Sequence, residues 1–202
     1  DSVFNYMSEL RSLQDLLMDP YLDRGFYCEF AEYCLLRLQQ ALRPVLAEGI
    51  DMLSYTGNVA SATMVGPKYY GENVLPYEKR LIDWIQQKCF GVIYHNCGDG
   101  SALIPCYNEL APRCYETMAE PPHADNSLAE CVEKFRQDIT LMGNIDQIDF
   151  LRTASAGDVS KKAAEVLALA KKHPRFILGT SDFLEEGTPA DNLRSLAMSV
   201  CR

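Results

Sequence analysis

The stretch GVIYHNCGDGSALIPCYNEL, residues 91–110, changes from apolar to polar and back to partly apolar along its length. It begins with the apolar run GVIY, continues with the polar residues HNCG, and ends in a segment whose apolar residues have helical spacing. A short apolar run bounded by turn residues is typical of a buried strand. A strand followed by a polar turn and an amphipathic helix is one β/α unit, so this stretch predicts an α/β fold.

The same unit recurs along the chain after Gly49. Short apolar runs alternate with amphipathic segments, which predicts parallel strands joined by helices. The predicted strands are residues 50–55, 91–95, 114–118, 139–142 and 176–179. The predicted helices are residues 67–88, 102–110, 127–137, 158–172 and 189–200.

About five parallel strands are too few for a closed (β/α)8 TIM barrel, which needs eight strands and about 250 residues. We therefore expect the C-terminal portion of such a barrel, preceded by a helical lead-in. An open doubly wound sheet is the alternative, because periodicity alone does not separate the two. An unpaired parallel edge favours association, so we expect either further strands upstream or edge-to-edge pairing in a homo-oligomer.

The first quarter of the chain has helical spacing throughout. We expect residues 1–48 to be a helical lead-in that belongs to the barrel, and residues 49–202 to be its C-terminal β/α units. One helix is predicted over residues 3–17. Because Asp1 is not an initiator methionine, we also expect the chain to be a piece of a longer product.

A second, long helix is predicted to begin at Asp19-Pro20, because proline is favoured at the first helical position. Pro44 should kink or end this helix, and Gly49 should close it. Apolar residues at every fourth position predict one buried stripe along it. They are Leu22, Phe26, Phe30, Cys34, Leu38, Leu42 and Leu46.

The composition restricts the class of protein. The 202 residues are 48% hydrophobic and 23% charged, which is typical of a globular domain with a core. The net charge of -9 disfavours nucleic acid as a partner, since like charge repels the phosphate backbone. No apolar run approaches the roughly 20 residues that span a bilayer, so we expect no membrane association and a cytoplasmic location.

The eight cysteines are expected to be free thiols in a reducing compartment. They are Cys28, Cys34, Cys89, Cys97, Cys106, Cys114, Cys131 and Cys201.

Polar residues end or directly follow each of the five predicted strands. They are Gly57-Asn58, His95-Asn96-Cys97-Gly98, Glu116, Gly143-Asn144-Ile145-Asp146 and Thr180-Ser181-Asp182. In parallel β/α folds the carboxyl ends of the strands line the active site. These clusters therefore predict a functional site at one end of the sheet.

His95 and Cys97 are the sharpest candidates. Residues two apart on an extended chain point to the same side, and imidazole nitrogen with thiolate sulfur suits zinc. The alternative is a polar strand end with a buried thiol.

The other candidates allow more than one role. Asn144 can bind a ligand or the backbone, and Asp146 can bind a ligand or cap the next helix. Asp182 can be a ligand, a base or a turn residue. His123, in the loop after the third strand, is expected to be a solvated histidine.

Five segments carry a resemblance to a known family. They are GIDMLSYTGNVAS, GPKYYGENVLPYEKRLI, YHNCGDGSALIPCYNELAP, LMGNIDQIDFLRTASAGDV and FILGTSDFLEEGTPADNL. Their order and spacing resemble the second half of the uroporphyrinogen decarboxylase (URO-D)-like superfamily, nearer its cobalamin-dependent methyltransferases than its decarboxylases. The resemblance extends from about residue 18 to the end of the chain, and it implies a (β/α)8 barrel.

The resemblance also implies a metal site. In the methyltransferase branch, zinc is held by an H-x-C pair and a later cysteine, and the pair matches His95 and Cys97. The later position is occupied here by Ser181 and Asp182. Asp182 can take the place of the thiolate, because carboxylate oxygen is an acceptable zinc ligand. Decarboxylases of the family carry a histidine near that place, where this chain has Thr180-Ser181.

The first functional hypothesis is a methyltransferase with a zinc-type site and a corrinoid (methylcobalamin) supplied by a separate protein. Its substrate would be a small methylated compound or a thiol acceptor. Asp182 and Glu116 would be catalytic, and one or the other would complete the ligand set. Asn58, Asn144 and Asp146 would shape the substrate pocket.

Two further hypotheses remain open. One is uroporphyrinogen decarboxylase or a related decarboxylase of porphyrin biosynthesis, which needs no metal but does need several converging cations for its polycarboxylate substrate. Most arginines here fall on helix faces instead. The other is a degenerate, non-catalytic barrel that binds a ligand or a partner.

Overall fold

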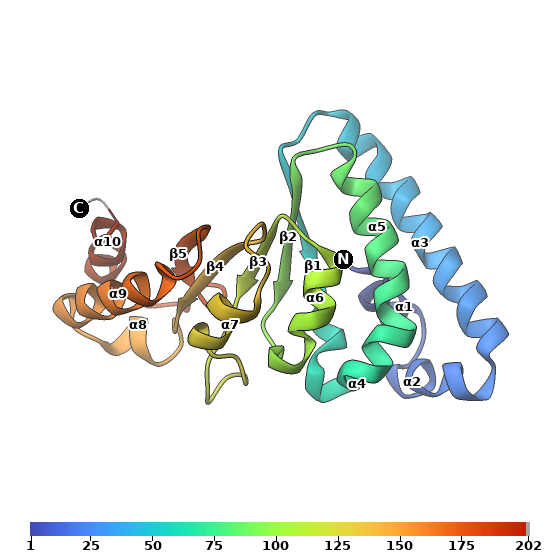
Figure 1. The fold of residues 1–202 in the computed structure, drawn as a ribbon, viewed down its shortest axis with the longest axis horizontal. Helices are drawn as coiled ribbons and strands as arrows, with labels where there is room; N and C mark the ends of the chain where they lie inside the picture. Colours follow the sequence, from blue (N-terminus) through green and yellow to red (C-terminus); the bar gives the residue numbers. More distant parts are fainter. Residues whose placement is uncertain (201–202) are drawn as a thin grey trace.

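Five parallel strands form one sheet in the computed structural model, which describes residues 1–200 (Figure 1). The strands are β1 (Met52–Thr56), β2 (Gly91–Asn96), β3 (Cys114–Thr117), β4 (Thr140–Ile145) and β5 (Phe176–Thr180). Each predicted apolar run therefore overlaps one of these strands. The strands lie in the order β1-β2-β3-β4-β5, so every strand pairs with its neighbour in sequence.

This sequential order separates the two folds that periodicity left open. A doubly wound sheet reverses its strand order at a switch point, whereas a barrel adds each new strand on the same side of the last. The absence of a reversal among the described strands identifies part of a (β/α)8 barrel, as predicted. Within residues 1–200 the sheet is open, with β1 and β5 at its edges.

The helices that follow the strands lie beside the sheet, and five of them contact one another in chain order (Figure 1). The helices that follow the strands are α4 (Ala62–Tyr69), α5 (Leu75–Gln86), α6 (Ile104–Leu110), α7 (Leu128–Lys134), α8 (Phe150–Thr153), α9 (Ala156–Ala170) and α10 (Ala190–Met198). Short 3-10 turns η1 (Asn58–Ala60) and η3 (Ser101–Leu103) follow β1 and β2.

The prediction of a single helix over residues 67–88 is wrong in detail. The segment is divided into α4, a π-helical turn η2 (Tyr70–Val74) and α5. Gly66 has a positive φ of 70° just before Pro67, so the backbone leaves helical geometry at this point.

The lead-in contains three helices instead of the two predicted. They are α1 (Val3–Leu10), α2 (Leu13–Leu22) and α3 (Arg24–Ala47). The helix predicted over 3–17 is interrupted because the Ser12 side chain caps a new helix by accepting from the Asp15 N–H. The long helix begins at Arg24, with Asp23 as its cap, and not at Asp19-Pro20. Pro44 lies inside α3 and Gly49, at φ 78°, follows its end.

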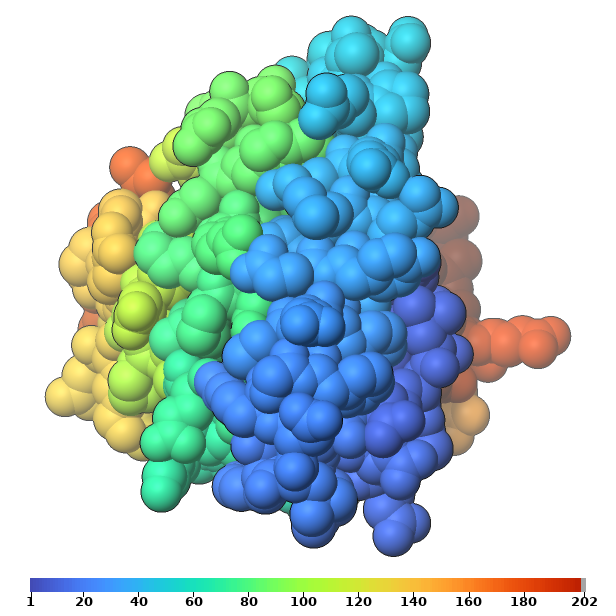
Figure 2. Space-filling view, turned by 90° about the vertical axis from the view of Figure 1, so that its right-hand side faces the viewer, coloured from blue at the N-terminus to red at the C-terminus, as the bar shows by residue number. Residues whose placement is uncertain are grey.

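The predicted stripe on the long helix is only partly buried. Cys34 and Leu46 are buried, but Leu22 is 75% exposed and Phe26 is 42% exposed. Because a helix turns about 100° per residue, a strict four-residue spacing drifts around the helix by about 40° at each step. Within α3 the stripe therefore turns gradually away from one face, and Leu22 is separated from the stripe because it ends α2. Figure 2 shows α3 beside the surface of α4 and α5.

A buried carboxylate joins the lead-in to the barrel. Glu78 of α5 accepts the Val3 and Phe4 N–H groups at 3.0 and 2.9 Å, and it also accepts the Tyr55 hydroxyl of β1. The negative charge thus lies at the N-terminus of α1, where the helix dipole favours it. Burial raises the pKa of Glu78, although these donors oppose the shift.

Tyrosines form the core between the sheet and its helices. Tyr55, Tyr94 and Tyr115 lie in register on β1, β2 and β3, and their rings stack with centroids 5.7 and 6.1 Å apart. Tyr107 of α6 packs on Tyr115 with centroids 4.9 Å apart. Since neighbouring residues on a strand face opposite sides, the next row of side chains points to the other face of the sheet.

The seven cysteines within residues 1–200 are all free, as predicted, and Cys201 lies outside the described residues. No helix in this described range is both long and apolar enough to cross a bilayer.

The tight packing around Tyr94 gives a stability prediction. Gly57, at the end of β1, lies so close to the Tyr94 ring that a Cβ atom there would overlap its hydroxyl and Cζ. Tyr94 is fully buried among other tyrosines, so it has no room to move. We expect Gly57→Ala to lower the free energy of unfolding by about 1–3 kcal/mol, which is typical of overpacking, in urea denaturation.

Gly71→Ala is the matched control, because a Cβ atom at Gly71 would meet no atom within 4 Å. Equal stability of the two variants would contradict the proposed constraint at Gly57.

Candidate functional site

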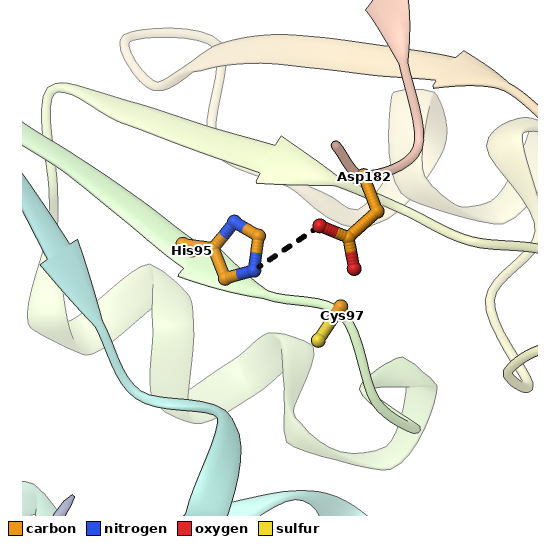
Figure 3. A group of neighbouring side chains, drawn as sticks. All are labelled: His95, Cys97 and Asp182. Atoms are coloured by element: carbon orange, nitrogen blue, oxygen red, sulfur yellow. Dashed lines mark ion pairs between the residues drawn. The ribbon is translucent and has the colours of Figure 1, made fainter. Parts of the chain in front are cut away.

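The structure brings His95, Cys97 and Asp182 together at the carboxyl ends of the strands (Figure 3). His95 is on β2, Cys97 follows that strand, and Asp182 comes from the loop after β5. One ligand atom from each residue, a ring nitrogen, the sulfur and a carboxylate oxygen, lies within 4.8 Å of the other two. This spacing allows a single metal ion to contact all three.

Strand register places Glu116 beside His95. His95 lies opposite Glu116 in the β2–β3 pairing, so both side chains share one face of the sheet. The two are joined by a hydrogen bond between His95 Nδ1 and Glu116 Oε1 at 3.0 Å. The other ring nitrogen, Nε2, faces Asp182 Oδ1 at 3.9 Å (Figure 3). Glu116 therefore fixes the ring orientation that presents Nε2 to the cluster.

The charges around His95 favour its protonated form in the protein alone. Hydrogen bonding to Cys97 and then to Glu116 raises the pKa of His95 from 6.5 to about 10, against the opposing effect of burial. A cation that binds here replaces this proton, because a metal ligand must be a neutral imidazole.

A cavity of about 330 Å³ opens beside this cluster. Its polar wall includes His95, Glu116 and Asp182, and its apolar wall includes Met142 and Phe183. Among the described residues, neither lysine nor arginine lines it. The cavity suits a small, partly apolar molecule better than one with several carboxylates.

Asn58 lies at the edge of the cluster. Its Nδ2 is 4.0 Å from Cys97 Sγ, and its Oδ1 accepts a hydrogen bond of 2.9 Å from Asn5 Nδ2 in α1. The lead-in thus orients a predicted site residue.

Asn144 and Asp146 do not line the cavity beside His95; both line a neighbouring one of similar volume. Asp146 acts as a cap: its Oδ1 accepts from Ile148 and Asp149 N–H groups, and its Oδ2 from the Phe150 N–H. Within the protein, Asp146 therefore has the capping role that the sequence allowed for it.

His123 is exposed as a residue, as the sequence suggested, but its ring is not free of contacts. Its side chain is 25% exposed, and its Nε2 lies 3.1 Å from Asp149 Oδ2. Sequence reasoning also missed Met142 and Phe183 as cavity residues. Strand register is the signal that could have identified Met142, because this residue lies opposite Glu116. Phe183 simply follows Asp182 in a loop, and no sequence pattern marks it.

Known proteins similar to this chain were found in three comparisons. A family model described as uroporphyrinogen decarboxylase (URO-D) matches residues 3–202. A methylated-thiol–coenzyme M methyltransferase of Methanosarcina mazei is 27% identical over 149 residues, which are 74% of this chain and 37% of the relative. A methylcobamide:CoM methyltransferase, MtbA, of Methanosarcina acetivorans is 19% identical over 127 residues, which are 62% of this chain and 35% of the relative. The matches thus span little more than a third of each curated relative.

A solved structure of a methyltransferase from Methanosarcina mazei has the same fold. It superimposes with a TM-score of 0.83 over 98% of this chain and 56% of its own length, at 14% sequence identity. At this identity the likeness concerns the fold alone, and it agrees with a partial barrel.

The raised pKa of His95 can be tested directly. We expect Cys97→Ser to lower it from about 10 toward 6.5, and Glu116→Gln to lower it less, because Cys97 is the larger cause. An NMR titration of the imidazole protons in metal-free protein measures both shifts. Cys106→Ser, which removes a thiol from α6, is the control. Unchanged titration in both site variants would show that the cluster is not formed.

Proposed function

The chain belongs to the uroporphyrinogen decarboxylase family, and on that premise we propose that it is part of a methyltransferase with a zinc-type site and a corrinoid protein as partner. The observation that carries the proposal is the convergence of His95, Cys97 and Asp182 beside a cavity at the strand ends. The names of the two curated relatives, both methyltransferases, support the reaction type.

The donor set fits zinc. Imidazole nitrogen, thiolate sulfur and carboxylate oxygen are its three usual kinds of protein ligand, and catalytic zinc sites use three protein ligands with one open position. Zinc bound by His95, Cys97 and Asp182 would supply a Lewis acid that lowers the pKa of a thiol or polarises a methyl-bearing atom. Asp182 would stand where the resembling methyltransferases have their later cysteine.

The surrounding side chains support this arrangement. Glu116 holds His95 Nδ1 at 3.0 Å, which leaves Nε2 for the metal and increases the basicity of the ring. Asn58 approaches Cys97 Sγ through its amide nitrogen, so it can stabilise the thiolate form.

The cavity favours a methylated substrate or a thiol over a porphyrinogen. Met142, Phe183 and Leu184 give it apolar walls, and its described lining has no cation to pair with substrate carboxylates. We therefore propose a small thiol or methylated compound as one reactant. A methylated corrinoid, delivered on a separate protein, is the other.

Metal analysis tests the zinc site. We expect Cys97→Ser and His95→Ala each to bind one equivalent of zinc less than the unchanged full-length chain, because each removes one of the three protein ligands of this site. Asp182→Ala should weaken zinc binding if the carboxylate is a ligand. Cys106→Ser, with the same chemical change in α6, should keep the metal. Equal zinc content in Cys97→Ser and Cys106→Ser would overturn the site.

Activity tests the reaction. We expect the full-length protein to demethylate methylcobalamin with a thiol acceptor, measured by the absorbance of cobalamin, and Cys97→Ser to be inactive. Glu116→Gln should lower zinc affinity about 10–100-fold, as outer partners of metal ligands do. Excess zinc should therefore restore its activity.

Two outcomes would contradict this function. Metal-independent turnover of uroporphyrinogen would identify a decarboxylase. No turnover of either compound would favour a barrel that only binds a ligand or partner.

A further inference from the structure

We propose a second divalent-cation site, formed by His123, Asp146 and Asp149. His123 lies in the loop between β3 and α7, Asp146 directly follows β4, and Asp149 precedes α8. One ligand atom from each lies within 4.8 Å of the others. No residue of this group belongs to the His95 cluster.

The three side chains already converge on one point. His123 Nε2 is 3.1 Å from Asp149 Oδ2 and 3.6 Å from Asp146 Oδ1. Asp146 is held rigidly, because three backbone N–H groups of residues 148–150 donate to its carboxylate. Its Oδ2 accepts only one of these bonds, at 3.2 Å, and so retains acceptor capacity for a cation.

An independent observation comes from Asn144. Its side chain is 6% exposed and lines the same cavity of about 330 Å³ as His123 and Asp146. Its Nδ2 donates to the Met118 carbonyl at 3.4 Å, but its Oδ1 has no partner among residues 1–200. A buried acceptor without a partner is unfavourable, because it has lost its water and gained no donor. A cation in the cavity, or water bound to it, would satisfy this oxygen.

The ligand chemistry selects the kind of cation. One imidazole with two carboxylates suits borderline or hard divalent ions such as Zn²⁺, Co²⁺ or Mn²⁺, whereas soft ions prefer sulfur. The cavity wall carries the carboxylates of Glu120 and Asp146 against the single positive charge of Lys162. Binding would tie the loop after β3 to the turn after β4.

Cobalt(II) distinguishes the two sites in one titration. We expect metal-free, full-length protein to bind two equivalents, only one of which gives the thiolate-to-cobalt absorption of a sulfur ligand. Cys97→Ser should remove that absorption and keep the second equivalent. His123→Gln and Asp149→Asn should keep the absorption and weaken the second equivalent by about tenfold or more.

The variants are chosen to leave the fold intact. Asp146 is spared because it caps a turn, whereas Asp149 is 64% exposed. Asp191→Asn is the matched control, since Asp191 is an exposed carboxylate paired with Arg194 on α10. Thermal midpoints without metal should agree among all of these proteins.

The proposal is overturned if His123→Gln and Asp149→Asn bind both equivalents as the unchanged protein does. It is also overturned if the unchanged protein binds a single equivalent that carries the thiolate absorption. A single equivalent without that absorption, lost in His123→Gln, would support this site and overturn the zinc site at His95.

Discussion

Side chains alternate between the two faces of the sheet along each parallel strand, and this alternation sets the positions of both the core and the site. Tyr55, Tyr94 and Tyr115 form one row in register, and their rings fill the space under the helices. The adjacent row, which includes His95 and Glu116, must then point to the opposite face. A slip of one residue would exchange the rows and bury the site. The aromatic core thus keeps the polar cluster on the opposite face of the sheet.

The strands could be predicted from sequence because each is a short apolar run that ends in polar residues. The lead-in could not be predicted as accurately. Ser12 and Asp23 start new helices through their side chains, and a helical pattern that continues past them conceals these starts. The stripe from Leu22 to Leu46 failed for two reasons: Leu22 belongs to α2, and a four-residue spacing exceeds one helical turn along α3. The strand order, which the sequence left open, required the structure.

The site was partly predictable. The spacing of His95 and Cys97 placed two donor atoms on one side of an extended chain, and the structure brings them together. Asp182 was a candidate only because it follows a strand, and its approach to His95 depends on the pairing of all the strands between them. Asn144 and Asp146 follow a strand as well, but they line the neighbouring cavity. Sequence does not reveal which of two cavities a turn will face.

The contact between Glu78 and the first turn of α1 has a consequence for the architecture. Two amides of the amino-terminal helix and a hydroxyl of β1 converge on one desolvated carboxylate. Without α1, the carboxylate would lose two of these donors and keep a charge or a proton in an apolar interior. The stability of the sheet therefore depends on α1, the helix nearest Asp1. We expect this helix and the sheet to unfold as one cooperative unit.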